Sequence, residues 1–438
     1  MPRLALAGLL AVVFALPALA AEPAAAPPAP APSPAQDHVK YVPKYEDPLL
    51  KEMEAADAKR DEAEEAATAK IRADRKAAKE AEKAARTTLR FDMSKLVKPA
   101  GPQAFKQAFH FPPQAQYLTN TCWSFSTTSF YESEIARLTG RKVKLSEIYT
   151  VYWEWVEKMR GFVRTRGDQP VAEGSESNAL PRIWKQYGIV PLSAYPGTKA
   201  ADGRHDHARL AQRMESFARW IKENDLWDED LVATMTRAIL DREIGAPPAS
   251  FEFEGKTYTP KSFLDDVTKL KLDDYVEMVS TLADPFYTFT EYKYPDNWWR
   301  SKEYYNVPLD EWYAALKRAL SAGYTVAVGG DVSEPGINGF EDAAIVPSFD
   351  VPQELIGQDA RELRINNGTT DDDHGLHAVG IAQAGEHDWI LIKDSGRSAR
   401  WGKFEGYYFY RDDYVKLKML GFTVHKDVVK DLLAKQAR

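Results

Sequence analysis

The composition of this chain changes sharply near Leu89, and the change decides where a folded core can form. Between Pro48 and Arg86 the sequence consists mainly of Ala, Glu, Lys and Arg, and large apolar side chains nearly vanish after Met53. From Leu89 to the C-terminus, aromatic and aliphatic residues are frequent and turn residues recur. Because the burial of apolar surface drives folding, we expect one globular domain over residues 89–438.

The preceding stretch, residues 47–88, has the composition of a solvent-exposed helix. Residues 51–86 carry ten acidic and ten basic side chains, and the commonest residue types there all favour helix. The stretch has no heptad repeat of apolar residues, so it does not predict a coiled coil. We interpret it as a charged, Ala-rich helical stalk, with an inhibitory pro-segment as the alternative.

The first 46 residues have the pattern of an export signal followed by a linker. Arg3 precedes an apolar run at 4–16, and Ala18-Leu19-Ala20 supplies the small residues of a cleavage site. The run is shorter than the roughly 20 residues that span a bilayer, which favours a cleaved signal peptide over 1–20 rather than an anchor. Residues 21–46 are rich in proline and alanine and predict an unpacked linker. We therefore expect a periplasmic or secreted protein with no membrane span after signal removal.

Periodicity predicts helices in the first part of the domain and strands in the last part. Helical patterns are found at 122–138, 145–159, 177–187, 208–223, 230–242, 260–281 and 309–322. Strand-like runs are found at 324–329, 377–383, 389–393, 407–410 and 422–425. Helices followed by strands indicate an α+β domain.

Cys122 is the only cysteine in the sequence. Exported proteins usually pair their cysteines as disulfides, so a lone thiol is expected to be either buried and inert or retained for its reactivity. The sequence places it in the first turn of a predicted helix with Asn120 as the N-cap. Unpaired N–H groups and the helix dipole there favour a thiolate. The same N–H groups can point at an oxyanion, and Gln116, just before the helix, can add a side-chain donor.

A thiolate nucleophile needs a base, and His377 has the most suitable setting among the eight histidines. His377 opens the apolar run of a predicted core strand, which is a rigid position, and a structural histidine is the alternative. Asp394 ends the next strand, 17 positions later, so a hairpin would let it orient the imidazole, unless it only caps a turn. The less suitable histidines lie in the linker, in a polar loop or in a turn, and include His38, His205, His207 and His374.

Several motifs follow one another in a recognisable order along the domain. They are Gln116, Cys122-Trp123-Ser124-Phe125, His377-Ala378-Val379-Gly380, Leu391-Ile392-Lys393-Asp394-Ser395 and residues 401–408. This order resembles the papain superfamily of cysteine peptidases, in which the oxyanion-hole glutamine precedes the cysteine by six positions, as Gln116 does here. The resemblance implies a papain-like α+β fold with a helical part and an antiparallel sheet or barrel.

Within the superfamily, the chain is more similar to bleomycin hydrolase and bacterial aminopeptidase C. His377 follows Cys122 by 255 positions, whereas papain needs roughly 130–150. The similarity implies an enlarged insertion at about 200–310. Residues 173–175 fall where these enzymes place a glycine-rich loop against the substrate, so Gly174 and Ser175 are the implied substrate-binding residues.

The chain departs from the family pattern at three places. The usual asparagine that orients the histidine is Asp394 here, and the tryptophan that shields it is Gly396. In the bleomycin hydrolase branch a C-terminal arm receives the substrate amine, whereas only 12 residues follow Lys426 here and are expected to form a short helix. Aminopeptidase and endopeptidase action both stay open.

The implied function is that of an exported cysteine-type peptidase that needs neither metal nor cofactor. Cys122 would attack the peptide carbonyl, His377 oriented by Asp394 would protonate the leaving amine, and Gln116 would help to hold the oxyanion. The alternative is a catalytically inactive papain-fold binding protein of the cell envelope. Peptides or proteins are the expected substrates, and oligomerisation is left open. The net charge of -8 and the pI of about 5.7 argue against nucleic acid as a partner.

Overall fold

The structure is a computed structural model that describes residues 37–436. The predicted signal peptide, 1–20, and most of the linker predicted over 21–46 lie outside the described residues. The chain divides into two compact units between Thr87 and Thr88. The second unit therefore begins where the sequence becomes rich in apolar residues.

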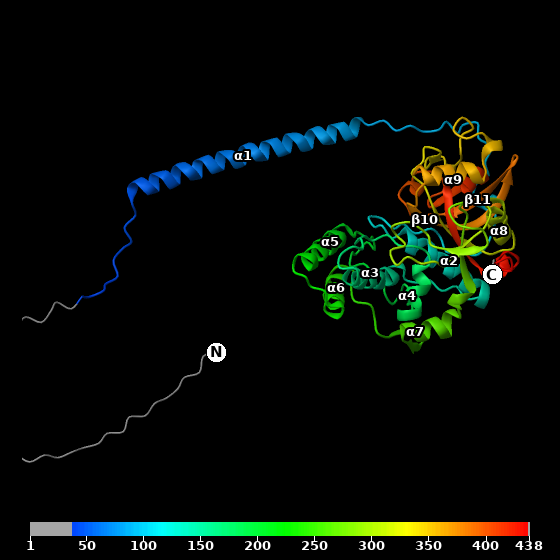
Figure 1. Cartoon of the computed structure of the whole chain (residues 1–438), viewed down its shortest axis with the longest axis horizontal. Coiled ribbons are helices and arrows are strands. Elements are labelled where there is room, and N and C mark those ends of the chain that lie inside the picture. The colour runs from blue at the N-terminus through cyan, green and yellow to red at the C-terminus, as the bar shows by residue number, and fades with distance from the viewer. Residues whose placement is uncertain (1–36, 437–438) are drawn as a thin grey trace, which may run out of the picture. The chain divides into compact units, whose positions relative to one another are not determined.

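The first unit contains the long helix α1 (Pro48–Ala85), drawn in blue in Figure 1. Asp47 caps it by accepting the N–H of Leu49 at 2.9 Å, and a proline at the first helical position suits the missing donor. Its side chains are all exposed, and ion pairs such as Lys70–Asp74, at 2.6 Å, are its stabilising side-chain contacts. Within residues 37–436 no helix, α1 included, combines the length and the apolar character that crossing a bilayer requires.

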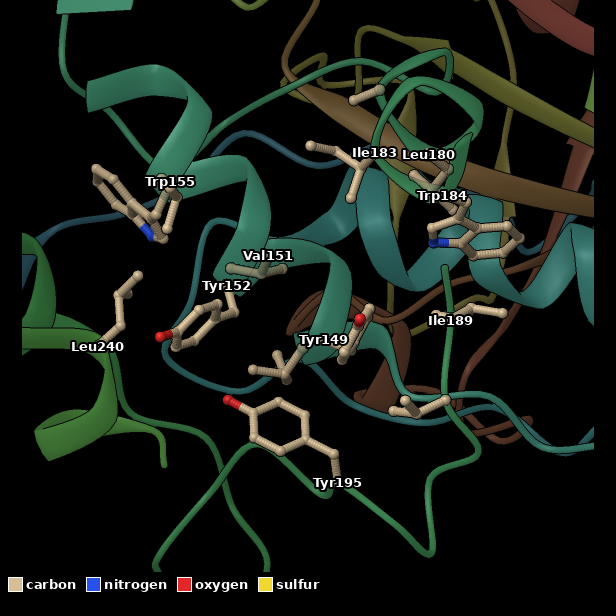
Figure 2. Packing of buried hydrophobic residues seen from close by; sticks show 14 of the residues in the cluster. Tyr149, Val151, Tyr152, Trp155, Leu180, Ile183, Trp184, Ile189, Tyr195 and Leu240 are labelled. Atoms are coloured by element: carbon tan, nitrogen blue, oxygen red, sulfur yellow. The ribbon is translucent and has the colours of Figure 1, made fainter. Parts of the chain in front are cut away.

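Helices make up one half of the second unit and share a hydrophobic core. They are α2 (Cys122–Thr139), α3 (Glu147–Arg164), α4 (Ala179–Tyr187), α5 (Ala208–Glu223), α6 (Glu229–Glu243) and the short α7 (Pro260–Phe263), joined by the hairpin of β2 (Phe251–Phe253) and β3 (Lys256–Tyr258). Figure 2 shows Tyr149 and Tyr152 of α3 between side chains of α4 and α6. Their spacing along α3 puts them on one face of the helix, which buries that face.

A large mixed sheet forms the other half of the second unit. Its strands run in the order β5-β6-β4-β13-β7-β10-β11-β12-β9-β8, with β1 beside β10. The strands are β1 (Lys106–Gln107), β4 (Tyr275–Val279), β5 (Thr288–Thr290), β6 (Tyr304–Asn306), β7 (Val326–Gly330), β8 (Ile337–Asn338), β9 (Ala343–Ala344), β10 (His374–Ala384), β11 (His387–Lys393), β12 (Tyr407–Arg411) and β13 (Met419–His425). The helices of this half are α8 (Leu309–Ser321), α9 (Gln358–Asn366), α10 (Asp412–Lys418) and α11 (Lys430–Leu433).

The central strand β10 separates two packed layers. Leu376 and Ala378 belong to a core shared with α8 and α10. The alternate residues, Gly375 and His377, face α2 instead. Helix α2 is thereby held between β10 and the helical half, and its buried residues run without a break from Trp123 to Ile135. This packing fixes the start of α2 next to the start of β10.

The predicted α+β class with a helical part and a sheet part is confirmed. The helix predicted over 260–281 is wrong in its second half, because Lys269 adopts a left-handed φ of 56° that ends the helical turns. The residues that follow form β4, which pairs with β13 in the main sheet. The segment 200–310 contains α5, α6 and α7, and it also contributes β4, β5 and β6 to the sheet.

Candidate active site

Helix α2 begins at Cys122, which places the lone thiol in the first helical turn. Thr121, rather than the predicted Asn120, is the N-cap, and its carbonyl accepts the N–H of Ser124 at 2.9 Å. The N–H groups of Cys122 and Trp123 come before the first intrahelical hydrogen bond and have no helical acceptor. Cys122 is half-buried. The thiol is therefore held by a rigid element at the edge of the solvent.

Glu173 holds the residues on both sides of Cys122. Its Oε2 accepts the N–H of Asn120 at 2.7 Å, and its backbone carbonyl accepts the indole N–H of Trp123 at 3.2 Å. Its Oε1 pairs with Nδ1 of the buried His207. The loop that carries Glu173 therefore positions the first turn of α2.

His374, the first residue of β10, hydrogen-bonds Asp394 and lines the same small cavity as Cys122. Its Nε2 lies 2.7 Å from Oδ1 of Asp394, which leaves Nδ1 for the thiol. Burial disfavours the charged imidazole, but Asp394 and Cys122 outweigh this effect and raise the pKa of His374 well above its ordinary value. The site therefore favours a protonated imidazole beside the sulfur.

Asp394 follows the last residue of β11 and is buried. Besides His374, its Oδ1 accepts the N–H of Gly396 at 2.7 Å, and its own N–H donates to the carbonyl of Gly406 at 2.9 Å. A Cβ on Gly396 would lie 3.1 Å from Nε2 of His374. The backbone at Gly396 thus lies against the ion pair, at the place where the family resemblance predicts a tryptophan.

The structure corrects the prediction that His377 partners Cys122. His377 is fully buried, and its Nδ1 lies 2.8 Å from Oγ of Ser129, in the middle of α2. Burial, and then the positive charge of Lys393, lower the pKa of His377 well below its ordinary value. His377 lies on the face of β10 that packs on α2 but meets the middle of that helix, whereas His374, at the start of β10, lies beside the first turn of α2.

Two features of the sequence could have indicated His374. The first is Gly375, where a Cβ would lie 2.9 Å from Oγ of Ser126 and 3.0 Å from Cα of Trp123, so β10 approaches α2 closely only because this side chain is missing. The second is position within the apolar run. His377 is followed at once by apolar residues, which favours burial, whereas His374 follows the polar residues Asp371 to Asp373.

Gln116 is buried beside the carboxylate end of the site. Its Nε2 donates to the carbonyl of Thr119 at 2.8 Å, and its Oε1 accepts the hydroxyl of Ser395 at 2.7 Å. Its backbone N–H donates to the carbonyl of Ser395 at 3.0 Å. The loop before α2 is thereby joined to the residue after Asp394, and one amide N–H of Gln116 stays available.

Of the two predicted substrate-binding residues, Ser175 lies at the wall of the site and Gly174 precedes it in the chain. Ser175 lines the small cavity that contains Cys122 and His374. Its hydroxyl donates to Oε1 of Glu154 at 2.7 Å. A side chain on Gly174 would collide with the carboxylate of Asp296. The glycine is therefore required for Asp296 to approach this wall.

No three His, Cys, Asp or Glu side chains converge as metal ligands in the part of the chain that the structure describes. The buried His207 pairs with the carboxylate of Glu173. The chemistry that the observed arrangement supports is nucleophilic, with a thiol, an imidazole and a carboxylate in series.

The site lies between a helical half and a sheet half, and it places a thiol at a helix start beside a histidine that is bound to a carboxylate. This combination of fold and site defines a papain-like cysteine peptidase, which is a hydrolase. Comparison with known families agrees. The model of the Peptidase C1-like family matches residues 63–437, and the chain belongs to this family.

Individual relatives carry the name aminopeptidase C. The protein of Lactococcus lactis subsp. cremoris is 23% identical over 360 residues, which cover 73% of this chain and 82% of the relative. That of Listeria monocytogenes is 26% identical over 261 residues, covering 50% of this chain and 58% of the relative. Among solved structures, PepW of Lactobacillus rhamnosis HN001 is similar with a TM-score of 0.60 at 18% identity, covering 79% of this chain and 88% of that one. The structural similarity supports the fold.

Proposed function

We propose that the protein hydrolyses peptide bonds with Cys122 as the nucleophile and His374 as the proton carrier. The thiolate adds to the carbonyl carbon, His374 gives its proton to the leaving amine, and the C–N bond breaks to leave a thioester. His374 then takes a proton from water, which cleaves the thioester and frees the thiol. Asp394 orients the imidazole of His374 and stabilises its protonated form. The observation that carries the proposal is that Cys122 and His374 line one cavity while His374 is hydrogen-bonded to Asp394.

The developing oxyanion needs donors at the start of α2. The Cys122 N–H belongs to the orphan donors of the helix start, and the remaining N–H of the Gln116 amide is the second donor in this proposal. Gln116 is kept in place by Ser395 and Thr119. Its geometry is therefore set before the substrate arrives.

The relatives named aminopeptidase C make removal of N-terminal residues the first candidate activity. Fluorogenic amides of single amino acids, compared with N-blocked peptides, test it. Cleavage of free-amine substrates alone would support an aminopeptidase, and cleavage of N-blocked peptides would show endopeptidase action.

Export to the periplasm or the medium is also proposed, on the basis of Arg3, the apolar run 4–16 and the small residues before position 21. Cell fractionation followed by N-terminal sequencing tests export. An uncleaved chain that begins at Met1 in the cytoplasm would refute it.

The mechanism is tested by labelling the purified protein with an epoxide inhibitor of cysteine peptidases and measuring its intact mass. We expect one covalent adduct on Cys122, and none in the Cys122→Ala variant. Hydrolysis that survives Cys122→Ala would overturn the nucleophile assignment.

An inactive papain-fold binding protein is the second candidate, and Gly396 in place of the shielding tryptophan is the observation that favours it. An absence of both labelling and hydrolysis, together with saturable binding of peptides, would support this candidate.

A further inference from the structure

The cavity that holds Cys122 and His374 is lined on another side by four carboxyl side chains. They are Glu176, Asp296, Asp372 and Asp373. The remaining wall includes small apolar surface from Ala327 and Val328. The cavity thus combines acidic groups with a short apolar strip within one site next to the nucleophile.

One side-chain oxygen of Glu176 lacks a hydrogen-bond partner in the described part of the chain, although its carboxyl group lies against that of Asp372. The side chain of Glu176 is only 8% exposed, and within the described residues Oε1 has no hydrogen-bond donor. A buried carboxylate oxygen without a donor is costly, so such atoms usually mark a missing partner. Glu176 lines the cavity, so a group bound there can supply the donor that Oε1 lacks within the described residues.

The charges around Glu176 are of the same sign. Burial, and then Asp372, Asp296 and Glu277, raise the pKa of Glu176 well above its ordinary value. Burial and Asp296 likewise raise the pKa of Asp372 to about 7, although the hydroxyl of Tyr292 donates to it at 3.0 Å. A cation in the cavity would relieve both the repulsion and the missing hydrogen bond.

The nearby lysine does not supply that cation. Nζ of Lys158 donates to the carbonyls of Ala172 and Gly174, and Lys158 does not line the cavity. Its charge acts on Asp296 rather than on the pair of Glu176 and Asp372. A positive group that enters with the substrate would therefore find an acidic site already formed.

We propose that Glu176 and Asp372 bind a cationic group of the substrate, an alkylammonium held a short distance from Cys122. Its source is either the free α-amino group at the start of a peptide or the side chain of a lysine near the scissile bond. The inference rests on the proposed peptidase function and adds the charge preference of the same site.

Two pairs of fluorogenic substrates that differ by one charge test the inference and separate the two sources. The first pair is alanyl-alanyl-aminomethylcoumarin and its N-acetyl form. The second pair is the N-acetyl-lysyl-alanyl amide and the same compound with an acetylated lysine side chain. A charge-assisted hydrogen bond predicts a ratio of kcat/KM on the order of 10- to 100-fold in favour of the charged member of at least one pair.

Glu176→Gln and Asp372→Asn keep the size of each side chain and remove its charge, so each should move that ratio toward one. Glu354→Gln removes a charge from an exposed residue outside the cavity and serves as the matched control. Circular dichroism checks folding, and Asp296→Asn replaces any variant that fails it. A ratio near one in the native protein, or a ratio that persists in the double variant of Glu176 and Asp372, would overturn the inference.

Binding measured without catalysis keeps the two proposals separate. Calorimetry on the Cys122→Ala variant, with alanyl-alanine amide and its N-acetyl form, and with the two lysine compounds as simple amides, reports the charge preference alone. Equal hydrolysis of charged and neutral substrates would support the peptidase function and refute the inference of a cation-binding site. The protein could instead bind the charged compounds preferentially while it is neither labelled by the epoxide inhibitor nor able to hydrolyse peptides. That result would refute the peptidase function and support the acidic site.

Discussion

His374 and His377 lie three residues apart on β10, and replacing each by alanine should separate chemistry from stability. His374→Ala removes the proton carrier and should lower kcat by roughly 10²–10⁴-fold. His377→Ala leaves a buried hole beside Ser129 and should cost about 2–4 kcal/mol of the free energy of unfolding while labelling of Cys122 persists. Steady-state kinetics and urea denaturation measure the two effects.

The opposite result for the two variants would assign the acid–base role to His377 rather than to His374. In that case His377→Ala would abolish labelling of Cys122 at unchanged thermal stability, and His374→Ala would hydrolyse peptides at the native rate.

Asp394 should set the pH range of activity through His374. The pKa of His374 is raised in the folded protein, so the imidazolium and its ion pair with Asp394 are fully present below the ordinary value of 6.5 and are lost as the pH rises through the raised value. Activity that needs the imidazolium therefore falls on that basic limb. Asp394→Asn removes the carboxylate charge and should move the basic limb of kcat/KM to lower pH.

Profiles of kcat/KM against pH, together with the rate of alkylation of Cys122, measure the shift. Asp388→Asn is the matched control, because Asp388 lies near the other end of β11 and pairs with Lys317. A basic limb that Asp394→Asn leaves in place would show that another group than His374 titrates there.

The sequence was informative about the helix start and less so about the strand. Cys122 follows a capping sequence and precedes a helical pattern, so its place in the first turn could be predicted from local signals. The base could not be chosen in the same way, because the choice between His374 and His377 depends on which part of α2 each residue of β10 lies against. The sequence predicted a strand that begins at His377, whereas Gly375 and Leu376 extend it by pairing with β7.

At the scale of elements, the close approach of β10 to α2 should depend on Gly375. A Cβ at this position meets the backbone of Trp123, which cannot move aside without displacing Cys122. Gly375→Ala should therefore separate His374 from the thiol and lower kcat/KM on the order of 10²-fold. Kinetics measure the loss, and Gly357→Ala, whose Cβ meets nothing within 4 Å, is the control. Native activity in Gly375→Ala would show that the approach is not needed.

The elements that could be predicted are those with strong apolar periodicity and room for several turns, such as α5 and α8. The strands that were missed are short or lie toward the edges of the sheet, such as β5 and β9, where two or three residues carry too little pattern. Strand β4 was mistaken for helix because it is buried on both faces and so lacks the alternation of apolar and polar residues that marks a half-exposed strand. Its pairing with β13 is a tertiary contact that the local sequence does not encode.

At the scale of the whole molecule, the family pattern in the sequence predicted the α+β class, while the role of the segment before Leu89 depends on α1. Large apolar side chains nearly vanish from α1 after Met53, so α1 has little apolar surface to bury in any core. A variant that begins at Thr88 should therefore unfold at the same temperature as the mature chain, and a stalk predicts that its kcat/KM is also unchanged.

An inhibitory pro-segment predicts a different outcome for the same truncation, because its removal would raise kcat/KM or the rate of Cys122 labelling. Calorimetry and fluorogenic peptides, applied to both chains at equal concentration, measure the difference. A lower unfolding temperature in the variant that begins at Thr88 would contradict both interpretations, since it would mean that α1 buries surface against the globular unit.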